Sequence, residues 1–208
     1  MVIDLTLSYS SRISGFSLDI AKSLTLDGWN ASNLHIYSHA GTHMDAPFHF
    51  EVSDDRIDEI SVERFVSMAH VVNIEITQPQ QLITEIDFLS IEKRLKAGDS
   101  VILKTGWHQF VGSAKYRNEL PRISESAAKW LVNKKVNMLA VEPPSVADVN
   151  NLAEVTLIHK ILLGGNIIIV EGICNTEDIT KEIVQLIALP LKILKGDGAP
   201  ARVIAIQE

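Results

Sequence analysis

Seven short apolar runs recur along this chain of 208 residues, and they limit the folds open to it more than any other feature. The runs, rich in β-branched residues, are VIDLTL (2–7), HVVNIEI (70–76), SVILKT (100–105), VNMLAV (136–141), NIIIVEG (166–172), IVQLIAL (183–189) and ARVIAI (201–206). Stretches such as NIIIV do not alternate with polar residues, which is typical of strands covered on both faces. We therefore predict a sheet whose central strands are buried by other elements.

Three helical patterns lie between these runs. Ser124 can cap the first, whose apolar stripe is formed by Ala127, Ala128, Leu131 and Val132. The second is ITEIDFLSIEKRLKAGD (83–99) and the third is LAEVTLIHKILLGG (152–165), and glycines mark the end of both. Strands and helices thus alternate through the middle of the chain. This order predicts an α/β fold, a single domain over residues 1–208 with a mixed central β-sheet flanked by helices.

The composition narrows the class of protein. Apolar residues make up 46% and charged residues 22%, as in an ordinary globular domain with one core. A net charge of −7 without long runs of one sign argues mildly against a nucleic-acid partner. Cys174 is the only cysteine, which excludes an internal disulfide. No signal peptide pattern opens the chain and no apolar run approaches ~20 residues, so we expect a cytoplasmic protein without a membrane partner.

The segment SHAGTHMDAPFHF (38–50) gathers side chains that can bind metal: His39, His43, Asp45 and His49. The spacing of the first two histidines suits a helix, but Asp45 would then point away, and the glycine, threonine and proline disfavour that helix. On a strand all four side chains share one face. A straight strand would separate residues 39 and 43 by ~13 Å, which is too far for one ion. We therefore predict a strand bent or bulged near Gly41.

Two imidazoles and one carboxylate suit Zn²⁺, and also Mn²⁺ or Fe²⁺, with positions left for water. A single buried histidine is more often a core or hydrogen-bonding residue than a ligand. Four such residues at one parity are harder to attribute to chance, and the spacing alone leaves the two interpretations evenly matched. No GxGxxG, Walker A or GxSxG motif occurs, which removes nucleotide-binding and serine-hydrolase interpretations.

The pattern H-x-G-T-H-x-D-x-P-x-H-F resembles the signature of the bacterial cyclase family of metal-dependent hydrolases, which includes the kynurenine formamidases (arylformamidases). The resemblance continues in SVILKTGW (100–107), AVEPPSV (140–146), IHKILLGGNIIIVEG (158–172) and LPLKILKGDGAPARV (189–203). It covers most of the chain, and it implies the swivelling β/β/α-type fold of that family.

The resemblance also implies a role for each residue of the signature. His39, His43 and Asp45 would bind one metal ion, and His49 would transfer protons. A second ion would use Asp45 again, together with His159 and Glu171. Without the resemblance, His159 would be a histidine in a helix core and Glu171 an exposed carboxylate at a strand end. One or two Zn²⁺ ions are expected, with Mn²⁺ as an alternative.

The family chemistry is hydrolysis of an amide C–N bond, in which the metal polarises the carbonyl and activates water. N-formyl-L-kynurenine, from tryptophan catabolism, is the first candidate substrate. The alternatives are another amide or cyclic imide, or a metal-binding protein without activity. The segment SYSSRISGFSLDIAKSLTLDGWN (8–30) lacks the proline- and glycine-rich sequence that many members carry beside the substrate, so the substrate stays open.

Several aromatic residues and one histidine have two interpretations. Trp107 and His108 would lie near the site by resemblance, but a core tryptophan and a surface histidine are equally consistent with the sequence. Phe16 and Trp29 could form aromatic walls for an aryl substrate, although core or interface roles are more common. The resemblance further implies a homodimer or homotetramer.

Overall fold

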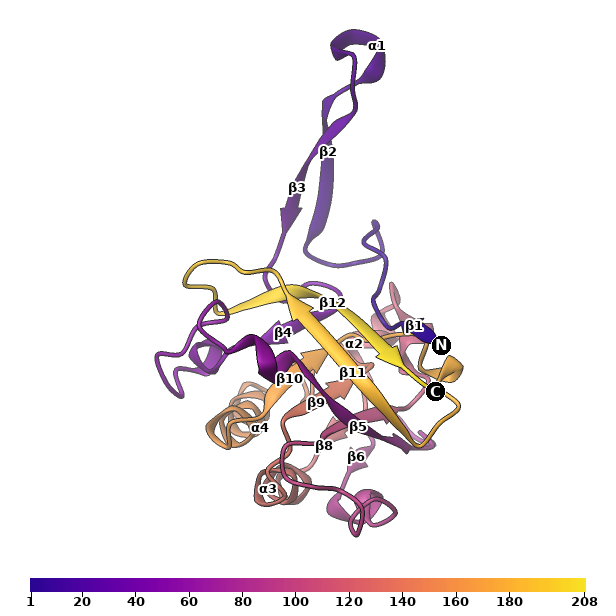
Figure 1. The fold of residues 1–208 in the computed structure, drawn as a ribbon, viewed down its shortest axis with the longest axis vertical. Coiled ribbons are helices and arrows are strands. Elements are labelled where there is room, and N and C mark those ends of the chain that lie inside the picture. Colours follow the sequence, from indigo (N-terminus) through magenta and orange to yellow (C-terminus); the bar gives the residue numbers. More distant parts are fainter.

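A mixed sheet of eight strands that closes into a barrel forms the body of the protein in the computed structural model, which describes residues 1–208 (Figure 1). In spatial order the strands are β1 (Val2–Asp4), β12 (Gly198–Ile206), β11 (Ile183–Pro190), β5 (Val66–Asn73), β7 (Ser100–Lys104), β9 (Met138–Val141), β10 (Ile168–Glu171) and β4 (His43–Asp45). β4 also pairs with β12, which closes the barrel. β5, β7, β9 and β10 run parallel and the other pairs are antiparallel, so the sheet is mixed, as predicted.

All seven predicted apolar runs contribute strands to this barrel. Their ends shift by a few residues, and the first run keeps only Val2–Asp4 as a strand. β4 falls within the strand predicted over the histidine motif, whereas two small pairs outside the barrel were not predicted. These pairs are β2 (Phe16–Lys22) with β3 (Ala31–Ile36), and β6 (Leu82–Ile83) with β8 (Arg122–Ile123).

Two of the three predicted helices are confirmed. α3 (Glu125–Asn133) begins after Ser124, whose side chain accepts the backbone N–H of Ala127, and its buried stripe includes Leu131. α4 (Leu152–Gly164) begins after Asn151 and buries His159 with its apolar face. The remaining helices are short: α1 (Leu24–Asp27), α2 (Ala114–Asn118) and 3₁₀ turns at Pro47–Phe50, Val62–Phe65, Glu85–Phe88, Trp107–Phe110 and Thr176–Asp178.

The predicted helix over 83–99 is wrong. Only Glu85–Phe88 is helical there, as a 3₁₀ turn, and the following residues form further turns. Asp87 accepts the backbone N–H of Thr84 at 2.7 Å, so a capping box closes the first turn at once. Phe88 and Ile91 are both buried, and bonds between residues three apart continue to Ile91. This tighter winding places both side chains under the sheet, and packing there outweighs the helical propensity of the segment.

Two hydrophobic clusters divide the core. One fills the barrel, and the other lies between the outer face of β7, β9 and β10 and the helices α3 and α4. No helix covers the outer face of β1, β12 and β11 (Figure 1). No helix of the fold has the length and apolar character needed to span a membrane.

One element stands apart from the body. β2, α1 and β3 form a long hairpin that projects away from the barrel, and we call residues 16–36 the arm (Figure 1). The chain returns from the arm directly into the segment that carries the histidine motif. The arm therefore accounts for most of the segment that departs from the family pattern.

Candidate metal centre

The histidine motif folds as a turn, a three-residue strand and a 3₁₀ turn. Gly41 has a positive φ of 63°, and a Cβ atom there would lie 3.3 Å from the ring of Tyr9, so the position favours glycine twice over. The predicted bend at Gly41 is therefore present, with His39 before it and β4 after it. The prediction that one strand face carries all four side chains is confirmed only for His43 and Asp45. It is wrong for His39, which lies in the turn before β4, and for His49, because Pro47 starts a 3₁₀ turn.

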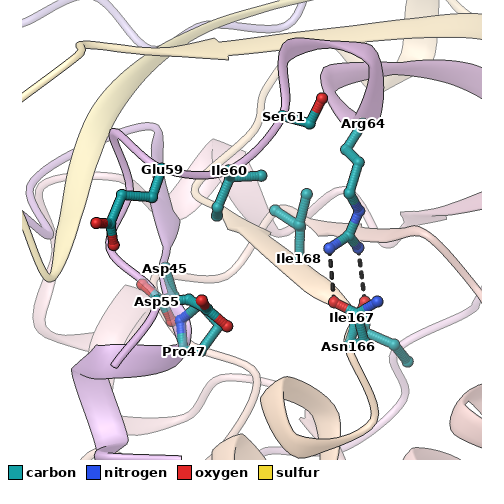
Figure 2. Close-up of a pocket in the computed structure, with 10 residues that line it drawn as sticks. All are labelled: Asp45, Pro47, Asp55, Glu59, Ile60, Ser61, Arg64, Asn166, Ile167 and Ile168. Carbon is teal, nitrogen blue, oxygen red and sulfur yellow. Dashed lines mark hydrogen bonds between the residues drawn. The ribbon is translucent and has the colours of Figure 1, made fainter. Parts of the chain in front are cut away.

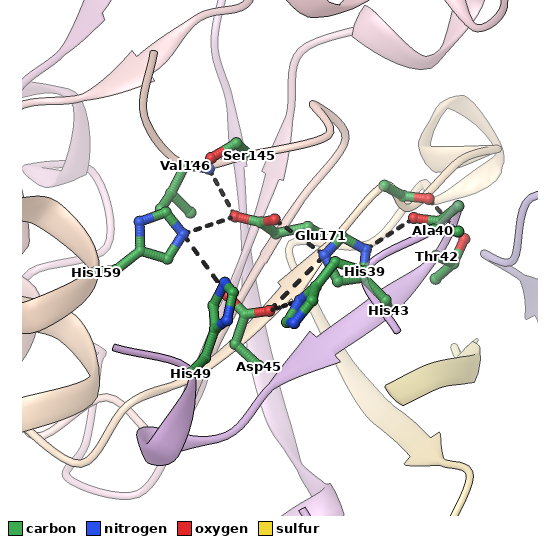
Figure 3. A network of polar contacts seen from close by, with 12 residues as sticks. His39, Ala40, Thr42, His43, Asp45, His49, Ser145, Val146, His159 and Glu171 are labelled. Atoms are coloured by element: carbon green, nitrogen blue, oxygen red, sulfur yellow. Dashed lines mark hydrogen bonds and ion pairs between the residues drawn. The ribbon is translucent and has the colours of Figure 1, made fainter. Parts of the chain in front are cut away.

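Closure of the barrel brings distant residues to this motif. β4 lies between β10 and β12, and its His43 is directly opposite Glu171. α4 packs beside them and supplies His159 (Figure 3). His43 thus meets two residues, His159 and Glu171, that each lie more than a hundred positions further along the sequence.

The distances within this group are short. His43 Nε2 lies 3.2 Å from Glu171 Oε2, and His159 Nε2 lies 3.5 Å from Glu171 Oε1. His159 Nε2 is also 3.6 Å from Asp45 Oδ2, while His39 Nδ1 is 2.8 Å from Asp45 Oδ1 (Figure 3). All five side chains are at most 8% exposed. Three sets have ligand atoms within 4.8 Å of one another. Two of them share Asp45 and are mostly buried: His39, His43 and Asp45, and Asp45, His159 and Glu171. The third, His39, His49 and Asp197, is only partly buried.

The donor atoms of the two sets suit a divalent cation. Asp45 Oδ2 is fully buried and has no hydrogen-bond partner, although buried polar atoms are almost always paired. Glu171 receives one backbone N–H, from Val146 at 2.7 Å. Two carboxylates and three imidazoles that converge with an unpaired oxygen are the mixed oxygen and nitrogen ligands of Zn²⁺ or Mn²⁺ sites.

In this group, burial and the interactions between charges shift the pKa values of His39 and Asp45 in opposite directions. Burial alone would lower the pKa of His39, but the carboxylates of Asp45 and Asp197 outweigh it and raise that pKa to about 9. Burial would raise the pKa of Asp45, but the neighbouring histidines hold it well below its usual range, so the carboxylate stays charged. For His49 burial prevails and lowers the pKa, so this imidazole is neutral at neutral pH.

Asp197 is a member of the site that the sequence analysis did not single out. Its carboxylate lies 2.8 Å from His39 Nε2 and 3.7 Å from His49 Nδ1, and it is half exposed. The only signal was its place in the segment 189–203, which matched the family. The adjacent Gly198 must lack a side chain, because a Cβ atom there would lie 2.6 Å from the His39 ring.

Two cavities open beside the group. One, of about 340 Å³, is lined by His39 and Tyr37 together with Arg12 and Arg117. The other, of about 550 Å³, is a shallower hollow bordered by His49 and Asp197. Both reach the group through partly exposed histidines, so a small molecule has access to it.

A third cavity, of about 200 Å³, adjoins the group only through Asp45 (Figure 2). Its one arginine, Arg64, donates to the side-chain and backbone oxygens of Asn166, both at 2.6 Å. Because no imidazole lines this cavity and its guanidinium is already engaged, we assign it no role in the site.

The remaining candidates lie outside the group. Trp107 is a core residue that donates its indole N–H to the carbonyl of Tyr116 at 2.9 Å. His108 pairs with the buried carboxylate of Glu142 at 3.0 Å, so it is neither a surface histidine nor part of the site. Phe16 contacts Tyr9 at the base of the arm, and Trp29 is 58% exposed near its tip. Within one chain, Trp29 cannot form a wall of the site.

The barrel and this buried group of imidazoles and carboxylates define a class, the metal-dependent α/β enzymes. A family model described as "Putative cyclase" matches residues 3–148, more than half of the chain. This chain belongs to the cyclase family, and it is a hydrolase of that family.

Two relatives in sequence carry the name kynurenine formamidase. The protein from Salinibacter ruber is 30% identical over 179 residues, and the one from Bacillus thuringiensis is 27% identical over 177 residues. Each alignment covers 84% of this chain and 79% of the relative.

Solved structures share the fold over the full chain. Isatin hydrolase A from Ralstonia solanacearum superposes with a TM-score of 0.89 at 24% identity, covering 100% of this chain and 92% of that one. A protein from Bacillus stearothermophilus titled "predicted metal-dependent hydrolase" gives 0.79 at 23% identity, covering 99% and 97%. At these identities the likeness concerns the fold alone.

Proposed function

We propose that this chain hydrolyses the amide C–N bond of a formylated aryl amine, with N-formyl-L-kynurenine as the preferred substrate and formate and kynurenine as products. The observation that carries the proposal is the unpaired, buried Oδ2 of Asp45, set among imidazoles and next to the accessible His49. The names of the relatives from S. ruber and B. thuringiensis support the choice of bond and substrate.

The two ligand sets would hold the cofactor. His39, His43 and Asp45 would bind one divalent cation, and Asp45, His159 and Glu171 a second, with zinc preferred and manganese as the alternative. A cation bound there supplies Lewis acidity, which polarises the amide carbonyl and makes a nearby water more acidic. His39 must give up a proton when the cation binds, because its pKa is raised to about 9.

His49 is placed for proton transfer. Its ring stacks on that of His39 with centroids 3.8 Å apart, and its side chain is only a quarter exposed. Because its pKa is lowered, the neutral ring can accept a proton from the attacking water at neutral pH. The same ring then delivers the proton to the departing amine nitrogen, which leaves badly as an anion.

The 340 Å³ cavity favours a substrate that carries a carboxylate. Arg12 and Arg117 line it, and neither guanidinium has a carboxylate or hydrogen-bond partner within the chain, unlike the paired Arg122 and Arg202. Arginine is suited to bind a carboxylate through two parallel hydrogen bonds. N-formylkynurenine has such a group remote from the amide, whereas a cyclic amide such as isatin is neutral.

Hydrolysis of a cyclic imide or amide is the second candidate. The fold shared with isatin hydrolase A and the altered segment 8–30 favour it. A metal-binding protein without activity is less consistent with the site, because a structural ion has no need of His49 as an additional proton carrier.

The test measures metal content and turnover on the same preparation. The metal-loaded protein should hydrolyse N-formylkynurenine faster than the neutral formanilide, and isatin slowest. Arg117→Ala should raise KM for N-formylkynurenine and leave formanilide hydrolysis unchanged, with Arg117→Lys as the partial rescue. Bound metal with isatin as the best substrate would select the second candidate. Bound metal with no amide turnover at all would refute both.

A further inference from the structure

A third group of ligand-type side chains lies at the edge of the candidate metal centre, and we call His39, His49 and Asp197 the outer set. His39 Nε2 lies 2.8 Å and His49 Nδ1 lies 3.7 Å from the same oxygen, Asp197 Oδ2. The two rings stack with their centroids 3.8 Å apart, so both present a nitrogen to that oxygen. Two imidazoles and one carboxylate are the same donor types as in the buried set that contains His43.

The outer set is held in place, and one of its donors is free. The carbonyl of Asp197 accepts the backbone N–H of Ala46 at 3.0 Å, and its carboxylate accepts the hydroxyl of Ser38 at 3.4 Å. The imidazole of His49, by contrast, makes no hydrogen bond within the chain. A neutral imidazole always has one bare nitrogen, so His49 can offer a lone pair to an ion without breaking an existing contact.

The outer set is open to solvent where the buried sets are closed. The side chains of Asp197 and His49 are 42% and 25% exposed, and both border the 550 Å³ hollow. That hollow also carries Glu51, Lys160 and Lys195, so its two acidic and two basic side chains balance. The cation-binding atoms are therefore confined to the point where Asp197 meets the two histidines.

His39 links the outer set to the buried one. Its Nδ1 lies 2.8 Å from Asp45 Oδ1 and its Nε2 lies 2.8 Å from Asp197 Oδ2. A neutral imidazole has one nitrogen that can bind an ion and one N–H. His39 can therefore bind an ion on either side while it donates its N–H to the carboxylate on the other. It cannot bind ions on both sides at once, so occupation of the outer set and of the first buried set is mutually exclusive.

We propose that the outer set is the entry site for metal: a divalent cation from the hollow binds there first and then moves to the first buried set, with His39 as the ligand common to both. The inference rests on the metal binding proposed above and is independent of the substrate. His49 then has a second task, in loading the ion as well as in proton transfer. An entry site lowers the barrier in both directions, so it speeds binding and release equally and leaves the equilibrium affinity unchanged.

The rate of Co²⁺ uptake by the metal-stripped protein tests the proposal, measured in stopped flow by the visible absorption of the bound ion. His49→Ala should slow uptake and release by the same factor, several-fold or more, with an unchanged Kd. Asp197→Asn should slow uptake by roughly tenfold, because a charge that attracts the cation at the entry site is lost. Circular dichroism melting checks that each variant is folded.

The cavity of Figure 2 provides the matched control, because it reaches the centre from Asp45 and not from the histidines. Asp55→Asn with Glu59→Gln removes two carboxylates there and should leave the uptake rate near that of the wild type. Slowing of this control as strong as that of Asp197→Asn would overturn the inference, since overall charge or the other cavity would then govern uptake.

Three further results would also overturn it. One is an unchanged uptake rate in both outer-set variants. Another is faster uptake in His49→Ala, because the ring would then block entry. The third is slower uptake in His49→Ala with a weaker Kd and an unchanged release rate, which would mean that the entry site does not assist release. A wild type that binds no metal at equilibrium would refute the proposed metal centre itself, which distinguishes that failure from the others.

Discussion

Two buried carboxylates end neighbouring parallel strands of the barrel, and they differ in how they are satisfied. Glu142 directly follows β9, and Glu171 is the last residue of β10. Both are nearly inaccessible to solvent, and both have a pKa lowered by hydrogen bonds that outweigh burial. From the backbone alone they would be interchangeable.

The carboxylate of Glu142 has hydrogen-bond donors at all of its acceptor positions. Its carboxylate accepts the backbone N–H groups of Thr105, Gly106 and His108 at 2.9 to 3.1 Å, the His108 ring at 3.0 Å and the Thr176 hydroxyl. These donors are fixed in the fold and leave no lone pair for a ligand. A carboxylate held in this way stabilises loops and is unavailable for chemistry.

Glu171 receives one backbone N–H and otherwise faces His43 and His159, beside an Asp45 oxygen with no partner. The supply of backbone donors therefore distinguishes a buried carboxylate that stabilises the fold from one that is free to bind a ligand. Substitutions at the two centres should therefore have different outcomes, one in activity and the other in stability.

The largest expected effect is at the candidate metal centre, which contains Glu171 and the unpaired oxygen of Asp45. His49→Ala should lower kcat on N-formylkynurenine by roughly 10²- to 10⁴-fold, the usual contribution of a general acid–base group. The metal content should stay near that of the wild type, because His49 is outside both sets that include Asp45. Parallel loss of metal and turnover in elemental analysis and steady-state assays would assign His49 to the ligands instead.

Glu142→Gln should lower the stability of the protein and leave its metal content unchanged. The free energy of unfolding at pH 6 should fall by about 3 kcal/mol, because a buried, multiply bonded charge is lost, while metal content is kept. Urea unfolding of the two proteins with metal analysis measures both. A Gln variant that loses its metal would remove the distinction between the two centres.

The pH dependence of that loss follows from the two partners. The pKa of Glu142 is lowered from 4.5, so its stabilisation is present above pH 4.5 and is lost as pH falls through the folded-state value. The pKa of His108 is raised from 6.5 by Glu142, so its contribution is present below pH 6.5 and is lost as pH rises through its folded-state value. The difference in the free energy of unfolding between wild type and Glu142→Gln should therefore be largest between pH 4.5 and pH 6.5.

Removal of metal should affect the candidate metal centre and leave the hydrogen bonds of Glu142 unchanged. Chelation should lower the stability of the wild type by about 2.7 kcal/mol relative to metal at one hundred times its Kd. Glu142→Gln should lose the same increment, because its donors do not involve the ion. Thermal melts with and without chelator show this, and a smaller increment in the variant would mean that the two centres are coupled.

The smallest expected effect concerns Asp197. Asp197→Asn keeps the shape but weakens the hold on His39, and partners of this kind are worth roughly 10- to 100-fold in metal affinity or activity. Calorimetric metal titration and kcat measure it. An unchanged metal affinity with a reduced kcat would indicate that Asp197 orients His49 and not the metal ligand His39.

Local patterns were enough for much of this fold. The apolar runs predicted the barrel strands, and Ser124 with its stripe predicted α3, because these signals lie within one element. The helix predicted over 83–99 was wrong because the segment instead forms 3₁₀ and other turns, which bury Phe88 and Ile91. The two strands of the arm were not predicted, although apolar and polar residues alternate over Phe16–Ile20.

The site was predicted unequally. The bend at Gly41 followed from residue types, but His159 and Glu171 came only from the family resemblance, because their bland local contexts conceal the contact with Asp45. Asp197 and the Glu142 network were missed. Both depend on pairings across the barrel, such as His39 with a carboxylate 158 positions away, which no local pattern encodes.

The strand that closes the barrel also sets when the site can exist. β4 carries His43 and Asp45, and it is held between β10 and β12, the latter beginning at Gly198. During synthesis the ribosome releases the histidine motif long before either partner strand. The nascent chain thus displays His39, His43 and Asp45 without the frame that orients them, and the full ligand group assembles only when the last strand emerges. Binding of metal by the proposed ligand group in its final geometry would therefore follow translation of β12.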